Sequence, residues 1–210
     1  MNVIIKQILL FSLIIIFGVS CKSDAEKTTV KDSSFNESEI SDKLNKDLSK
    51  GELMELVSPG KIAPAGKLRD INNEELDLKD FKDNFLVVYF WATYCSPCLK
   101  GLPEFMELSA NYDVEHVKFI AISIDEEYDY WQEYLIEHNL TTNNYWLGAD
   151  ESNKVTAFTL SKIEIENKMH LLSALPKSVI LSDKGEIIMN DNIKMSASVL
   201  NEHLGSYTKL

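Results

Sequence analysis

Cysteine, histidine and positive charge are all scarce in this sequence. Its 210 residues contain three cysteines, at positions 21, 95 and 98, and four histidines. A structural zinc site needs four Cys or His ligands and a second close pair of cysteines is missing, so a zinc protein is the weaker interpretation. Lys and Arg number 21 against 33 Asp and Glu, which gives a net charge of −12. Because phosphate backbones need basic surfaces, we expect no nucleic-acid partner.

Long hydrophobic runs are also rare, apart from one near the N-terminus. Lys6 is followed by an apolar stretch over residues 8–17, interrupted only by Ser12. Its length predicts an export signal at residues 1–20. The alternative is an uncleaved membrane anchor of about eighteen apolar residues, near the lower limit for crossing a bilayer. Either segment would place the rest of the chain outside the cytoplasm.

The signal segment ends in a cysteine. Residues 18–21, Gly-Val-Ser-Cys, resemble a bacterial lipobox, in which small residues precede a cysteine that is lipidated and becomes the mature N-terminus. Gly18 departs from this pattern, which usually has leucine there. The resemblance implies lipidation of Cys21 and a lipid membrane as a partner. It describes an extracytoplasmic, membrane-anchored lipoprotein that faces the periplasm.

A polar segment separates Cys21 from the folded part of the chain. Residues 22–50 are rich in Ser, Lys, Asp, Glu and Asn, with few regularly spaced apolar residues, which predicts a flexible tether. We therefore divide the chain into three parts: a signal peptide at 1–20, the lipidated cysteine and tether at 21–57, and one domain of ordinary size at 58–210.

Cys95 and Cys98 stand at the end of an apolar, aromatic-rich stretch. Residues 87–92 predict a strand, and Pro97 fits the first turn of a following helix, where its missing N–H has no helical partner. Two cysteines three positions apart on such a turn can join, and the helix N-terminus stabilises a thiolate. We therefore predict a redox-active dithiol, in which Cys95 attacks a partner and Cys98 resolves the mixed disulfide. No metal and no cofactor beyond this disulfide is expected.

Three other interpretations of the cysteine pair stay open. A zinc site would have to recruit Cys21 or the scattered histidines. A purely structural disulfide would suit an oxidising compartment. Two inert core thiols are disfavoured, because a strand-to-helix turn is a surface feature.

Two separate motifs resemble the thioredoxin superfamily, and more closely its TlpA/ResA-like branch of extracytoplasmic, membrane-tethered thiol-disulfide oxidoreductases. The first motif comprises residues 90–93, Phe-Trp-Ala-Thr, together with Pro97 and with Pro103 in the following helix. The second is Leu175-Pro176, which resembles the cis-proline loop of the family and is followed by a strand and a turn. Their order along the chain matches that of the family.

The resemblance, which covers residues 58–205, implies an α/β thioredoxin-like fold with a central mixed β-sheet flanked by helices and an N-terminal hairpin extension. It also implies an enzyme, a protein-disulfide reductase that reduces or exchanges disulfides of exported proteins, with cytochrome c maturation as a candidate pathway. A membrane thiol electron donor would re-reduce it. A proline within the motif favours a potential nearer the roughly −270 mV of thioredoxin than the about −120 mV of a strong oxidant. Partner contacts would come from Trp91, Tyr94, Pro97, Leu175 and Pro176.

Two positions depart from the family pattern. Tyr89 stands six residues before Cys95, where an acidic or amide residue is frequent, and Gly101 stands three residues after Cys98, where the branch often has Glu. The group that accepts the Cys98 proton is therefore open among water, the Tyr89 hydroxyl and Glu104. These departures also keep a second function open, a non-catalytic thioredoxin-fold module that binds peptides.

Peroxidase and copper-binding functions receive less support. Cys95 lacks a threonine three residues before it, and no guiding arginine is evident. His170 could approach the cysteine pair, but thioredoxin-fold copper chaperones space their cysteines one residue wider.

The remaining pattern predicts the elements of the domain. A hairpin is expected at 67–78, a buried parallel strand at 117–124, and a helix capped by Asp125 and running to Asn139. Residues 161–173 exceed what a minimal thioredoxin domain needs, and we expect them to form an elaboration beside the active-site mouth that influences partner choice. Further helices are expected at 151–160 and 196–204.

Overall fold

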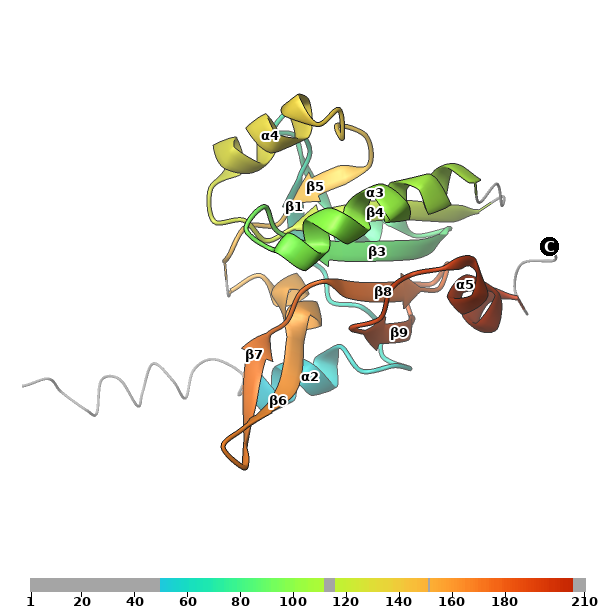
Figure 1. Ribbon diagram of the computed structural model, residues 1–210. Helices are drawn as coiled ribbons and strands as arrows, with labels where there is room; N and C mark the ends of the chain where they lie inside the picture. The colour runs from blue at the N-terminus through green and yellow to red at the C-terminus, as the bar shows by residue number, and fades with distance from the viewer. Residues whose placement is uncertain (1–49, 112–115, 151, 206–210) are drawn as a thin grey trace, which may run out of the picture. The chain divides into compact units, whose positions relative to one another are not determined.

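A seven-stranded sheet lies at the centre of the part of the chain that the computed structural model describes, residues 50–111, 116–150 and 152–205. The strand order is β2-β1-β5-β4-β3-β8-β9 (Figure 1). The sheet is mixed, because β3 runs parallel to β4 and antiparallel to β8. Its strands are β1 (Lys67–Arg69), β2 (Glu75–Asp77), β3 (Phe85–Trp91), β4 (Val117–Ser123), β5 (Asn144–Trp146), β8 (Lys177–Leu181) and β9 (Ile187–Asp191).

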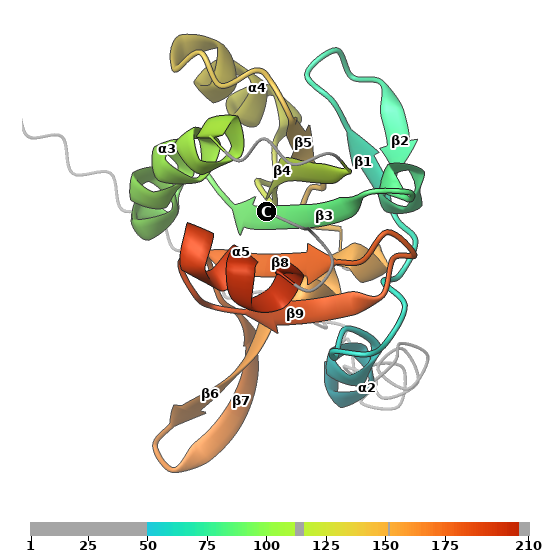
Figure 2. The ribbon, with the colours of Figure 1, turned by 90° about the vertical axis from the view of Figure 1, so that its right-hand side faces the viewer.

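Helices cover both faces of this sheet (Figures 1 and 2). One face carries a core that includes side chains of α3, α4 and α5. The opposite face carries a second core, to which α2, η1 and η2 contribute. These elements are α2 (Lys50–Leu56), η1 (Leu78–Phe81), α3 (Ser96–Asn111), α4 (Tyr128–Glu137), η2 (Lys154–Thr159) and α5 (Ala197–Leu204).

The strand β3 contributes to both cores. Successive side chains of a strand point to opposite faces, and every residue of β3 after Phe85 is buried. On the α3 side lie Val87, Tyr89 and Trp91. On the other side lie Leu86, Val88 and Phe90. A strand packed on both faces gives a fixed base to the loop that follows it, which carries the cysteine pair.

Several predicted elements are confirmed and others differ. The N-terminal hairpin is formed by β1 and β2, and β4 is the buried parallel strand. The helix predicted to start from Asp125 begins later: its N-cap residue is Glu127. The Asp125 carboxylate instead accepts a hydrogen bond from Thr93. On α4 the buried residues are Trp131 and Leu135. The helix predicted at 151–160 is the shorter 3₁₀ helix η2.

The fold includes residues before 58. Residues 50–57, assigned to the tether from sequence, contain α2, and Val57 is buried in the second core. No helix in the described ranges is both long and apolar enough to cross a bilayer. The predicted signal segment and Cys21 lie outside the described residues.

The segment predicted to be an elaboration forms a hairpin of its own. The strands β6 (Leu160–Ile165) and β7 (Lys168–Ser173) pair only with each other among the described strands. Glu166 and Asn167 connect them, both with positive φ, as a two-residue hairpin turn requires. The hairpin projects from the body of the domain, as Figure 2 shows.

Candidate active site

Cys95 and Cys98 form a disulfide at the junction of β3 and α3, with their Cα atoms 5.2 Å apart. Cys95 precedes the helix and is 8% exposed, whereas Cys98 lies in its first turn and is 0% exposed. The backbone N–H of Cys98 donates to Cys95 Sγ at 3.2 Å. This N–H and the positive end of α3 would stabilise a thiolate on Cys95. Only Cys95 is therefore placed to meet a partner.

A buried carboxylate holds the loop in front of the cysteines. Asp125 Oδ1 accepts from the Thr93 hydroxyl at 2.6 Å and from the Thr93 N–H at 3.0 Å. Its other oxygen accepts from the Ser123 hydroxyl at 2.6 Å. The indole N–H of Trp146 donates to the Asp125 carbonyl at 2.8 Å. Asp125 thus ties the loop after β3 to the end of β4, a role that sequence reasoning missed.

Tyr89 and Gly101 lie together on the interior side of the disulfide. The Tyr89 hydroxyl donates to the Cys98 carbonyl at 3.1 Å, and its ring stacks on Phe105. A Cβ atom on Gly101 would lie 2.5 Å from that hydroxyl. The two departures from the family pattern are therefore one arrangement, in which a tyrosine hydroxyl fills the space of a side chain at position 101.

This arrangement narrows the choice of proton acceptor for Cys98. Burial raises the pKa of Tyr89 to about 12, and the negative charge of Glu104 adds to the effect. Tyr89 is therefore neutral near pH 7 and acts as a hydrogen-bond donor. Glu104 forms an ion pair with Lys194 at the surface. Tyr89 and Glu104 are thus each engaged with another group. Water is therefore the favoured acceptor of the Cys98 proton among the three candidates.

The coupling of Tyr89 and Gly101 gives a stability prediction. Gly101→Ala alone should destabilise the domain by about 1–3 kcal/mol, because the buried ring cannot move its hydroxyl away. In the Tyr89→Phe background the nearest atom is the ring Cζ, 3.5 Å from the new Cβ, which is ordinary contact. There the same change should stabilise the helix by about 1 kcal/mol. Urea unfolding of the four proteins measures this cycle, and additive effects would show that the two residues are not coupled.

The proline loop lies beside the end of β3. Lys177 pairs with Phe90, so the preceding residues, Leu175 and Pro176, continue next to the start of the cysteine loop. The peptide bond between them is cis, as predicted. The Asn192 amide donates to the carbonyls of Ala174 at 3.1 Å and Pro176 at 2.9 Å, which fixes the loop.

The predicted partner-contact residues differ in exposure. Tyr94 is 69% exposed and Pro97 is also exposed, both next to Cys95. Leu175 and Pro176 are half-buried at the loop. Trp91 is 0% exposed and its ring packs near Tyr134, so it cannot touch a partner and is a core residue.

His170 lies on β7 and is exposed. In the described part of the chain no group of three or more His, Cys, Asp or Glu residues could hold a metal ion.

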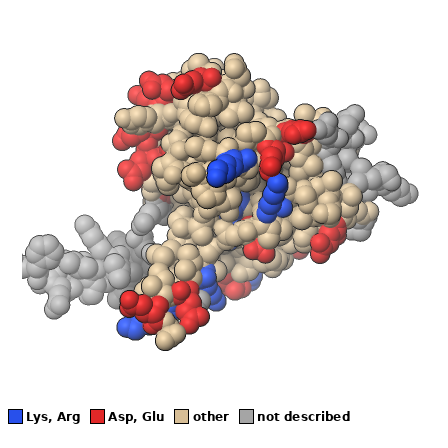
Figure 3. Space-filling model, viewed as in Figure 1, with Lys and Arg blue, Asp and Glu red and all other residues tan. Residues whose placement is uncertain are grey.

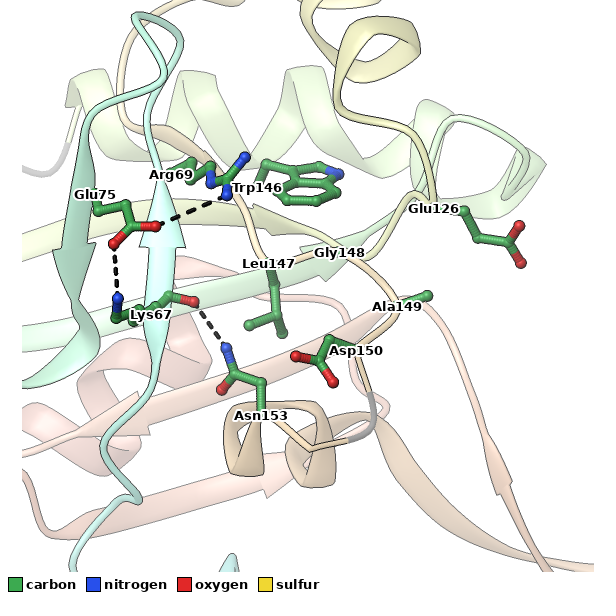
Figure 4. Close-up of a pocket in the computed structure, with 10 residues that line it drawn as sticks. All are labelled: Lys67, Arg69, Glu75, Glu126, Trp146, Leu147, Gly148, Ala149, Asp150 and Asn153. Atoms are coloured by element: carbon green, nitrogen blue, oxygen red, sulfur yellow. Dashed lines mark hydrogen bonds and ion pairs between the residues drawn. The ribbon is translucent and has the colours of Figure 1, made fainter.

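A cavity of about 410 Å³ is lined by residues that include Arg69, Glu126 and Trp146 (Figure 4). The Arg69 guanidinium lies 5.6 Å from the centre of the Trp146 ring, and Arg69 also pairs with Glu75 at 3.7 Å. A Cβ atom on Gly148, whose φ is +74°, would lie 2.9 Å from the same ring. Trp146 lines this cavity and also donates a hydrogen bond to Asp125, which holds the cysteine loop. Neither cysteine lines the cavity.

Known proteins resemble this chain in sequence and in fold. Residues 59–189 match the model of the AhpC/TSA family. Thiol-disulfide oxidoreductase ResA of Bacillus cereus is 27% identical over 160 residues, which cover 76% of this chain and 83% of that protein. ResA of Bacillus subtilis is 22% identical over 153 residues, which cover 71% and 76%. The thioredoxin domain of a thiol-disulfide oxidoreductase from Bacteroides vulgatus superposes with a TM-score of 0.55 at 19% identity, covering 71% of this chain and 97% of that one.

The fold and the cysteine pair define a thiol-disulfide oxidoreductase of thioredoxin-like fold, as predicted from the two motifs. The chain belongs to the AhpC/TSA family.

Proposed function

We propose that the protein reduces or exchanges disulfides of exported proteins through Cys95 and Cys98, while a lipid on Cys21 holds it at the membrane. The observation that supports this most directly is the asymmetry of the pair: Cys95, just before the N-terminus of α3, is 8% exposed, whereas Cys98 is fully buried. The likeness to ResA proteins makes a role in cytochrome c maturation part of the proposal.

The proposed reaction transfers two electrons in two exchange steps. In the reduced protein, the Cys95 thiolate attacks one sulfur of the partner disulfide, and the other partner sulfur leaves as a thiolate and takes a proton. Cys98 then gives its proton to water and attacks Cys95 Sγ. This step breaks the mixed disulfide, releases the second partner thiol, and leaves the Cys95–Cys98 disulfide. A membrane thiol donor would return the two electrons by the reverse exchange.

The reduction potential tests the direction of this reaction. We expect the Cys95–Cys98 pair to have a potential nearer roughly −270 mV than about −120 mV, because Pro97 lies between the cysteines. Equilibration with dithiothreitol buffers of known potential, followed by thiol labelling and mass measurement, gives the value. A potential close to that of a strong oxidant would contradict the reductase assignment and favour disulfide formation in partners.

A further inference from the structure

One face of the β6–β7 hairpin carries three apolar side chains, two of which are exposed. The cross-strand pairs Ser161/Leu172, Ile163/His170 and Ile165/Lys168 lie on this face, because directly opposed residues share a side of an antiparallel pair. Ile165 is 44% exposed and Leu172 is 40% exposed. We call these six residues the hairpin face. Large apolar side chains grouped on a surface in this way mark an interaction site more often than isolated ones do.

The hairpin face is joined firmly to the proline loop. Lys177, buried at the start of β8, donates to the Leu160 carbonyl at 3.3 Å, to Ser161 Oγ at 3.1 Å and to Asn192 Oδ1 at 3.2 Å. Asn192 in turn holds the carbonyl of Pro176. One network of hydrogen bonds therefore fixes the base of the hairpin and the loop beside the cysteines.

The hairpin also leads directly to the site. The last residue of β7, Ser173, is followed by Ala174 and then by the Leu175–Pro176 bond. In Figure 1 the hairpin extends from the end of the sheet at which β3 ends and α3 begins. A polypeptide attached through its own cysteine to Cys95 would therefore continue past the proline loop toward the hairpin. Six residues of β7 offer roughly 20 Å of strand along that path.

The hairpin face carries no carboxylate, although the hairpin as a whole carries charges of both signs. Among the residues of the hairpin face only Lys168 and His170 are ionisable, so this face lacks the carboxylates that dominate a chain of net charge −12. Glu164 lies on the other face, and Glu166 lies in the turn. Figure 3 shows charged side chains of both signs gathered over the hairpin.

We propose that the hairpin face binds an extended, apolar segment that flanks the disulfide of the partner protein. This inference rests on the proposed function, because it supplies the partner specificity of the same site. The occupant is a polypeptide with apolar side chains at alternate positions, which an incompletely folded exported protein exposes and a folded one buries.

Two synthetic peptides test the proposal. Both contain one intramolecular disulfide; in one it is flanked by alternating Val and Thr, and in the other by Gly and Ser. We expect the reduced wild-type protein to reduce the Val/Thr peptide about tenfold faster in kcat/KM, mainly through a lower KM. The Ile165→Ser/Leu172→Ser variant should lose this preference and should reduce the Gly/Ser peptide at the wild-type rate.

A matched control comes from α4. Ile136 is 59% exposed and lies outside the hairpin, so Ile136→Ser removes a comparable apolar side chain and should keep the tenfold preference. Thermal unfolding followed by circular dichroism checks that each variant folds, and the single variants Ile165→Ser and Leu172→Ser replace the double one if it does not.

Each remaining outcome has a definite meaning. A wild-type protein without preference, or a double variant that keeps it, would overturn the inference alone. Equal loss on both peptides would assign the hairpin to support of the cysteine site and also overturn it. Failure of the wild-type protein to reduce either peptide would overturn the proposed function, and the inference with it. A wild-type dimer that the double variant cannot form would show that a second copy covers this face instead.

Discussion

Replacing Cys95 by Ser is expected to reduce disulfide turnover by at least about 10³-fold, to the rate without protein. Cys98 cannot take over the attack, because it is fully buried in the first turn of α3. A serine hydroxyl does not replace the thiolate that disulfide exchange requires. The turbidity assay of insulin reduction with dithiothreitol measures this turnover. Unchanged turnover would leave the non-catalytic peptide-binding module as the function of the fold.

Replacing Cys98 by Ser separates the two steps. Cys95 can still attack, but the mixed disulfide has no neighbouring thiol to resolve it, so a covalent adduct should accumulate close to one per protein. Non-reducing electrophoresis and mass measurement detect the adduct. Cys21→Ser is the matched control, because it removes the only other cysteine of the chain and should leave turnover of the detergent-solubilised protein unchanged.

The features predicted correctly from sequence depend on residues close together in the chain. The cysteine spacing, Pro97 and the apolar run before them define a strand, a turn and a helix start without reference to the rest of the molecule. The hairpin of β1 and β2 is equally local. The second motif could be recognised far downstream because Leu175-Pro176 is itself a local pattern.

The features that sequence reasoning missed depend on contacts between elements. Asp125 resembles a helix cap in sequence, and its bonds to Thr93 exist only because the ends of β3 and β4 meet in a parallel pair. The family resemblance implies that Trp91 contacts a partner, but Trp91 is fully buried. Its burial follows from the packing of α4 on the sheet, which the local pattern does not reveal.

Replacing Asp125 by Ala is expected to destabilise the domain by about 3 kcal/mol or more. The change leaves the Thr93 N–H, the Thr93 hydroxyl and the Ser123 hydroxyl without their acceptor in a buried place, and bonds to a charged group are worth about 1.5–3 kcal/mol each. Because Thr93 begins the loop that carries Cys95, kcat/KM should also fall about tenfold at temperatures where the variant is still folded. Urea unfolding and insulin reduction at 10 °C measure the two effects.

Asp125→Asn and Asp129→Asn separate positioning from charge. Both remove one negative charge, but Asp129 is exposed on α4, so only the change at Asp125 should lower activity. The amide at position 125 can accept with its oxygen but turns a donor toward one of the two hydroxyls. The activity of Asp125→Asn should therefore lie between those of the wild type and Asp125→Ala. Loss of the carboxylate should also raise the reduction potential, because a negative charge near the loop disfavours the Cys95 thiolate and hence the reduced form. If Asp125→Asn lowered stability but left both kcat/KM and potential at the wild-type values, Asp125 would stabilise the fold without positioning the cysteine loop.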